Sequence, residues 1–259
     1  MNKNLTTTEK LEHLFSTLKR HLQLKGISAK EFDESSYLLS GKSLRNELFK
    51  EMIKISNYTK KPQVVSIEKY RTLPACNFAF LGTQIKSDEL YRGSKIIEHH
   101  ANLLCDEKYH VGVGDISNGL YATTSFNTAL DYTRREPMPG LVLKLKIPEA
   151  KIIDDITLGV DLSRVLDGWL TTVDEHQPVL EDLANFVAEI QDEDEKKLFA
   201  NLFFDDLGLV AILLGYDALY DHKFPSFALF NREKICVSTN EYNRICNASA
   251  YHKDFMIKE

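Results

Sequence analysis

The sequence predicts an α+β protein, because its apolar residues follow two different periods in separate parts of the chain. Helical spacing runs through the first sixty residues and returns over residues 161–204. Short runs rich in β-branched and aromatic residues occupy parts of residues 63–92 and 227–237. With 259 residues, 43% hydrophobic and 27% charged, the chain has ample apolar material for a globular core.

The first predicted unit is a helical lobe over residues 1–62. Thr6 opens a capping box ahead of an apolar stripe, and Gly26 ends that helix. The same signature recurs at Ser28, and Ser43 begins a third helix. We expect these amphipathic helices to pack onto the rest of the chain, because a lone amphipathic helix is marginally stable.

Residues 63–259 form the second predicted unit, a domain of strands interrupted by a helical insert at about residues 161–204. Gly112, Gly114 and Gly119 indicate a flexible loop. A short helix should end near Leu213, before a turn and another strand. The predicted strands are residues 63–67, 77–81, 89–92, 120–125, 141–147, 216–219, 227–230 and 235–237.

The composition limits which partners and which cellular locations we expect for this protein. A net charge of −6 and a pI near 5.8 argue against nucleic acid as the main partner. No apolar run reaches the roughly 18 residues of a membrane span, and the N-terminus lacks the apolar segment of a signal peptide. We therefore expect a protein of the cytoplasm, or one delivered into a target cell by a secretion system.

The cysteines and histidines show no metal-ligand spacing, so no metal is expected. Reduced thiols buried in the core are the prediction for the cysteines. His99, His100 and His110 are expected on the surface or in loops. The cysteines are Cys76, Cys105, Cys236 and Cys246.

Residues 90–132 carry the pattern that points to a ligand. Arg92 leaves a strand beside Gly93, and this pair suits a phosphate, because guanidinium offers a planar fork of donors and glycine admits close approach. Ser125 then falls at a strand-to-helix corner, with Asn127 as the expected helix cap.

These residues resemble the arginine–serine–glutamate class of ADP-ribosyltransferases. The resemblance rests on Arg92 in a strand, the strand Thr123-Thr124-Ser125, the helix pair Ala129 and Tyr132, and the segment at residues 215–219 before a late strand. It implies a split antiparallel β core and NAD as substrate. It further implies mono-ADP-ribosylation of a protein target, as toxins and effectors perform it.

The resemblance also implies residue roles. Arg92 and Ser125 would hold NAD and serve catalysis, with Gly93 and Thr124 beside them. Tyr121 could stack on nicotinamide, because aromatic faces stack on heterocycles, although packing within the sheet explains it equally well.

This sequence departs from the family at the third motif. The position of the family's glutamate falls near Pro225 or Ser226, and neither residue is acidic. An oxocarbenium-like transition state needs a carboxylate near the anomeric carbon. We expect Asp217 to supply it, because this acid interrupts an apolar strand. The other candidates are Glu193 within the acidic run 191–195, Asp205, Asp206, Asp221 and Glu233, which also suit helix caps and turns.

Two other functions fit the same residues. An NAD glycohydrolase toxin would use the same cleft with water as acceptor. A binding module would keep the fold without the acid. The residues alone support an α+β domain with an anion-binding arginine–glycine corner.

Overall fold

The computed structural model describes residues 5–32, 42–80, 82–105, 112–113, 118–134, 140–166 and 175–256. The helices are α1 (Thr7–Lys25), α2 (Lys42–Ile55), α3 (Ile67–Thr72), α4 (Ile97–Cys105), α5 (Phe126–Asp131), α6 (Asp155–Leu166), α7 (Gln177–Glu189), α8 (Glu193–Asp205), α9 (Leu207–Leu213), the 3-10 turn η2 (Arg232–Lys234) and α10 (Thr239–Met256). The strands are β1 (Gln63–Val65), β2 (Cys76–Phe80), β3 (Thr83–Ser87), β4 (Leu90–Ser94), β5 (Gly112–Val113), β6 (Asn118–Ala122), β7 (Leu141–Leu145), β8 (Ile152–Asp154), β9 (Ala218–Asp221), β10 (Ser226–Leu229) and β11 (Cys236–Ser238).

The predicted α+β class is confirmed, and a five-stranded sheet of order β5-β6-β10-β9-β8 forms its centre. Strand β8 pairs with β9 in parallel and the other pairs are antiparallel, so this sheet is mixed. Strands β6, β9 and β8 therefore run in the same direction, and their carboxyl ends meet at one edge. Among the described residues, three strand pairs lie outside this sheet: β2–β3 and β4–β7 are antiparallel, and β1–β11 is parallel.

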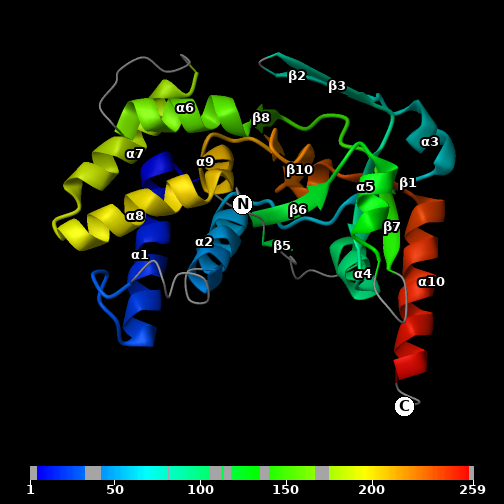
Figure 1. The fold of residues 1–259 in the computed structure, drawn as a ribbon, viewed down its shortest axis with the longest axis horizontal. Coiled ribbons are helices and arrows are strands. Elements are labelled where there is room, and N and C mark those ends of the chain that lie inside the picture. The colour runs from blue at the N-terminus through cyan, green and yellow to red at the C-terminus, as the bar shows by residue number, and fades with distance from the viewer. Residues whose placement is uncertain are drawn as a thin grey trace.

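Both faces of the central sheet are buried, each against a different hydrophobic core. In β10 the side chains alternate: Phe227 and Leu229 enter one core, while Ala228 and the following Phe230 enter the other. Helices α1, α2 and α6 to α9 gather on one side of the sheet, at the left of Figure 1, and α3, α4, α5 and α10 gather on the other side. The sheet thus separates two helical layers.

The N-terminal helices and the insert helices share a single core. Buried leucines of α1 and α2 belong to the same cluster as those of α6 to α9, together with Phe230 from the sheet side. Phe15 of α1 makes an edge contact with Phe199 of α8 at a centroid distance of 5.2 Å. A boundary near residue 62 therefore divides the sequence into two parts without dividing this core.

Several local predictions are confirmed. Thr6 and Glu9 form the capping box of α1, and Gly26 ends the helix in the left-handed region. Helix α9 ends at Leu213, and Gly215 turns the chain with φ 83° before β9. The Ser28 signature forms only a turn with Glu31, and the helix expected after it enters residues 33–41, outside the described residues.

Other elements differ from the prediction. Helices α3, α4 and α10 and strands β3, β5 and β8 were not predicted from the sequence. Gly112 and Gly119, expected in a flexible loop, are paired residues of β5 and β6, and Ala228 and Phe230 pack closely around Gly119. Gly114 lies outside the described residues. The pairing of β6 with β5 and β10 places Gly119 within the sheet.

We predict that deleting residues 1–62 abolishes cooperative folding, because the deletion exposes the core that α1 and α2 share with the insert helices. Thermal unfolding followed by circular dichroism should then show no cooperative transition near the parent melting temperature. A truncated chain that unfolds as sharply as the parent, at a similar temperature, would contradict a shared core.

Candidate functional site

Arg92 lies in the middle of β4, opposite Leu143 of β7, and is only 8% exposed. Its Nη1 donates a hydrogen bond to the carbonyl oxygen of Tyr121 in β6 at 3.1 Å. The guanidinium therefore reaches across from one strand pair to the central sheet. A buried arginine held by a backbone carbonyl has a fixed position, which favours ligand recognition.

Strand β4 meets β6 at a single bridge. The backbone of Tyr91 exchanges hydrogen bonds with that of Thr123, at 2.7 and 2.9 Å. The hydroxyl of Thr123 donates to the carbonyl of Pro225 and accepts from the backbone N–H of Ser125. We call Arg92, Tyr121 and residues 123–125 the Arg92 corner. Two segments predicted to form one site thus lie together.

Ser125 ends this corner as the N-cap of α5. Its hydroxyl accepts a hydrogen bond from the backbone N–H of Thr128 at 3.2 Å. The predicted cap, Asn127, is therefore wrong: it lies inside the first turn, because the helix begins at Phe126. The serine hydroxyl therefore has a structural role as a helix cap, in addition to its position in the Arg92 corner.

Gly93 supports the corner by packing. A Cβ at this position would lie 1.8 Å from the carbonyl oxygen of Ala129, so only glycine lets α5 approach β4 this closely. Tyr121 is half-buried with its side chain against the helical core, the packing role left open by the sequence. Thr124 is also half-buried.

Asp217 lies far from the Arg92 corner. It precedes β9, and the strand register places it level with Gly119, four residues before Thr123, or on the order of 13 Å along the sheet. Its Oδ2 accepts from the backbone N–H of Lys151 and its Oδ1 accepts from Asn231 Nδ2, at 2.9 and 2.7 Å. Both carboxylate oxygens thus hold the starts of β8 and β9 to the end of β10.

A second buried acid, Asp206, forms hydrogen bonds at the same edge of the central sheet as Asp217. Asp206 is fully buried, caps α9 through Gly208, and accepts from the side chain of Asn118 at 2.9 Å. We call Asn118, Asp206, Asp217 and Asn231 the amino edge. Their hydrogen bonds satisfy buried polar groups where the strands begin.

The opposite edge of the central sheet carries a different set of polar side chains. By register, Asp221 lies level with Ser226 of β10 and so with Thr123, two strands away. Asp154 ends β8, Asp155 follows it, and His222 follows β9. We call Thr123, Ser125, Asp154, Asp155, Asp221 and His222 the carboxyl edge. Ligands of open sheets often bind at such strand ends.

Three of these residues could hold a metal ion, which the sequence did not indicate. Ligand atoms of Asp154, Asp155 and His222 lie within 4.8 Å of one another. His222 Nε2 is 3.4 Å from Asp154 Oδ1, and the backbone N–H of His222 donates to Asp155 Oδ1. The parallel pairing of β8 with β9 brings together these residues, which are distant in sequence. The one local feature of the sequence that could have indicated the site is the pair Asp154-Asp155 directly after an apolar segment.

The remaining acid candidates lie elsewhere. Glu193 is exposed in the first turn of α8, behind its cap Asp192, and Asp205 ends that helix. Glu233 forms an ion pair with Lys60 at 2.9 Å. These positions suit caps and surface pairs.

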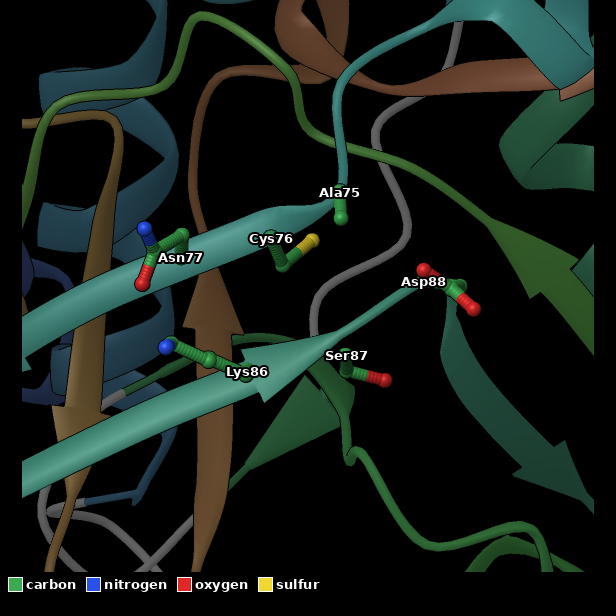
Figure 2. Close-up of a pocket in the computed structure, with 6 residues that line it drawn as sticks. All are labelled: Ala75, Cys76, Asn77, Lys86, Ser87 and Asp88. Carbon is green, nitrogen blue, oxygen red and sulfur yellow. The ribbon is translucent and has the colours of Figure 1, made fainter.

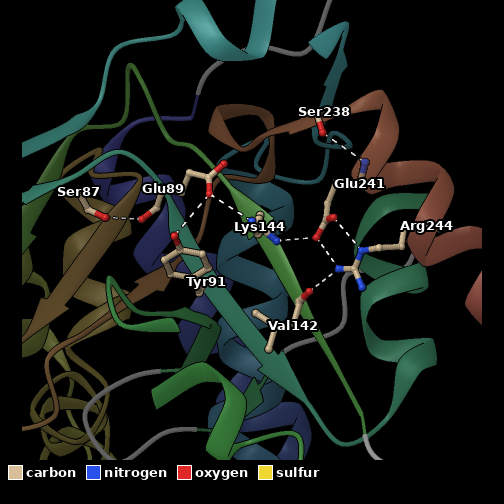
Figure 3. A network of polar contacts seen from close by, with 8 residues as sticks. All are labelled: Ser87, Glu89, Tyr91, Val142, Lys144, Ser238, Glu241 and Arg244. Atoms are coloured by element: carbon tan, nitrogen blue, oxygen red, sulfur yellow. Dashed lines mark hydrogen bonds and ion pairs between the residues drawn. The ribbon is translucent and has the colours of Figure 1, made fainter. Parts of the chain in front are cut away.

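Figure 3 shows the polar network that fixes the β4–β7 pair carrying Arg92. Glu241 of α10 accepts from the backbone N–H of Lys144 at 2.8 Å and pairs with Arg244, which donates to the carbonyl of Val142. Hydrogen bonding to Glu241 raises the pKa of Arg244. Tyr91 donates to Glu89 at 3.5 Å. Helix α10 is thereby tied to the strands behind the corner.

His100 corrects the expectation of surface histidines, because it is fully buried in α4. Its Nε2 lies 2.8 Å from the carbonyl of Leu141, and burial, followed by the charge of Arg92, lowers its pKa to about 3. It is therefore a neutral core histidine that donates to a backbone carbonyl. His99 is half-buried in the same helix, and His110 lies outside the described residues.

The cysteines follow the prediction only in part. Cys76 and Cys236 are buried, and burial raises the pKa of each thiol. Cys105 is exposed and Cys246 is half-buried, so the expectation of a core thiol is wrong for this pair. Both lie on helices that the sequence did not predict.

An open pocket of about 340 Å³ lies apart from the Arg92 corner. It forms where β2 begins and β3 ends, and Figure 2 shows its lining side chains. Lys86 and Asp88 contribute opposite charges, and Cys76 contributes a buried thiol. Its lining residues are Ala75, Cys76, Asn77, Lys86, Ser87 and Asp88.

Comparisons of the chain with protein-family models, with curated proteins and with solved structures find no match. Among the described helices, none is long and apolar enough to cross a membrane. The resemblance to ADP-ribosyltransferases therefore stays a prediction.

We predict that Asp155→Asn raises the melting temperature near pH 7 by a few degrees and that this gain disappears near pH 3. Burial, together with the charge of Asp221, raises the pKa of Asp155. A raised folded-state pKa means that the stability gained by protonation is lost as the pH rises through that pKa. Asparagine cannot ionise and keeps an oxygen for the His222 backbone N–H.

Calorimetry across this pH range, in buffer containing a chelator, measures the effect. Asp182→Asn on the exposed side of α7 is the matched control and should change little at either pH. A lower melting temperature for Asp155→Asn near pH 7 would contradict the prediction.

Proposed function

We propose that the protein binds NAD at the Arg92 corner and transfers ADP-ribose from it to a protein acceptor. One observation carries the proposal: the Tyr91–Thr123 bridge holds the strand of Arg92 against the turn that ends in Ser125. The resemblance in sequence depends on this pair of segments. Their contact supports it, since nothing in the local sequence requires strands so far apart to touch.

The corner suits the anionic half of a dinucleotide. Arg92 offers a fork of N–H donors whose orientation is fixed by the Tyr121 carbonyl at 3.1 Å. Ser125 and the first turn of α5 lie one strand away. A guanidinium beside hydroxyls matches a diphosphate and ribose, because diphosphate accepts bidentate hydrogen bonds and ribose both donates and accepts.

The chemistry needs a carboxylate beside the ribose as nicotinamide leaves. The strand register favours Asp221 for this role, because it is level with Thr123, whereas Asp217 is committed to the amino edge. Asp221 is 2% exposed and one oxygen accepts from the Phe224 backbone. In our proposal Asp221 stabilises the developing positive charge.

Incubation with labelled NAD, with and without cell lysate, tests the reaction. Label on a protein band supports transfer. Free ADP-ribose without labelled protein would indicate a glycohydrolase instead, with water as acceptor. Binding of NAD without turnover would indicate a binding module, and no binding would overturn the proposal.

We predict that Arg92→Ala abolishes NAD binding and that Arg92→Lys restores it poorly, because a point charge cannot replace the bidentate fork. Isothermal titration calorimetry measures the affinity. Arg134→Ala, which removes an exposed arginine paired with Asp131 just after α5, is the control and should bind like the parent.

Melting temperatures of these variants separate lost binding from lost folding, since Arg92 is buried. If a folded Arg92→Ala protein binds NAD as the parent does, the assignment of the corner is wrong.

The two aspartates should respond in opposite ways. We predict that Asp221→Asn keeps NAD affinity within a few-fold while lowering turnover by on the order of a hundredfold, because the carboxylate acts mainly on the transition state. Asp217→Asn should lower the free energy of unfolding by on the order of 1–3 kcal/mol, because the amide group cannot accept both hydrogen bonds. Its turnover should stay close to the parent's.

Turnover, affinity and denaturant unfolding measured on both variants decide between them. A stable Asp217→Asn protein with a large loss of turnover would restore the sequence-based assignment of Asp217. A fully active Asp221→Asn protein would exclude Asp221.

A further inference from the structure

Two thiols from distant parts of the chain lie in contact on the face of the molecule opposite the shared helical core. Cys105 is the last residue of α4, and Cys246 lies in the middle of α10. Their sulfur atoms are 3.2 Å apart and share a hydrogen bond. A disulfide bond is about 2.05 Å long, so the two sulfurs need to approach by roughly 1 Å to bond.

The surroundings of the pair give the two thiols different roles. Cys105 is exposed, and its S–H donates to the hydroxyl of Tyr242 at 3.5 Å. Burial, and then the hydrogen bond with Cys105, raise the pKa of Cys246 to about 11. Cys105 is therefore the sulfur that a reagent in solution reaches, and Cys246 is held behind it as the second thiol.

We propose that Cys105 and Cys246 form a reversible disulfide when the protein meets hydrogen peroxide. In the first step the Cys105 sulfur attacks one peroxide oxygen, the O–O bond breaks, the departing hydroxide takes up the thiol proton and leaves as water, and a sulfenic acid forms. In the second step the Cys246 sulfur attacks the sulfenic sulfur, the S–S bond forms, and a second water carries away the sulfenic hydroxyl and the thiol proton. The two sulfurs together lose two electrons to the peroxide.

The bond would tie α10 to α4, on the side of the molecule that supports the β4–β7 pair. Helix α10 already holds β7 through Glu241 and Arg244, and α4 holds it through His100. A covalent link closes a loop of more than a hundred residues, which restricts the unfolded chain strongly. Oxidation should therefore stabilise this side of the fold. The proposal does not depend on NAD binding.

The test oxidises the full-length, reduced protein with hydrogen peroxide, blocks remaining thiols by alkylation in denaturant, and maps peptides without reduction. We expect a Cys105–Cys246 cross-linked peptide, alkylation of Cys76 and Cys236 only, and a rise in melting temperature on the order of 5–10 °C. Dithiothreitol should reverse both changes. Cys105→Ser and Cys246→Ser should each abolish the cross-link and the shift.

A chain with both buried cysteines replaced, Cys76→Ser with Cys236→Ser, is the matched control and should still form the cross-link. Four alkylatable thiols after oxidation, a cross-link between other cysteines, or sulfinic acid at Cys105 would overturn the proposal. A Cys105–Cys246 bond that leaves the melting temperature unchanged would overturn its stabilising role.

Discussion

The burial of the central sheet on both faces is the constraint on which the rest of the structure depends. Strand β10 places alternate side chains into two separate cores, and Phe227 and Phe230 on opposite faces are both fully buried. A slip of one residue would exchange every side chain between the cores. The register of β10 with β6 and β9 is therefore fixed by packing, and it sets which residues lie at each edge.

With both faces covered, polar side chains of this sheet collect at the ends of its strands. The amino edge uses its acids for support: Asp206 and Asp217 accept hydrogen bonds from the buried side-chain amides of Asn118 and Asn231. The carboxyl edge presents another set: Asp221 lies level with the end of β6, and Asp154 and Asp155 lie at the end of β8, three strands from β6. One sheet thus separates a structural edge from the edge that suits a ligand.

The Arg92 corner depends on elements that make no contact with a ligand. Strand β4 reaches the central sheet through one backbone bridge, so its position rests on α5, which packs on Gly93, and on the network through Glu241 of α10. Helices α10 and α4 both hydrogen-bond to β7, the strand that pairs with β4 along its whole length. This arrangement connects the C-terminal helix to the candidate site.

The sequence by itself determined the helical and strand segments with strong periodicity, the cap of α1, the turn at Gly215, the place of Arg92 in a strand and that of Ser125 at the start of a helix, because these depend on neighbours within a few residues. It failed for α4 and α10, which pack on each other and on neighbouring strands, because an isolated helix is marginally stable without such packing. The different hydrogen bonds of Asp217 and Asp221, the grouping of Asp154, Asp155 and His222, and the contact between Cys105 and Cys246 were decided only by the tertiary structure. Each depends on strand register or helix packing between residues far apart in the chain, and local propensity carries no information about such distances.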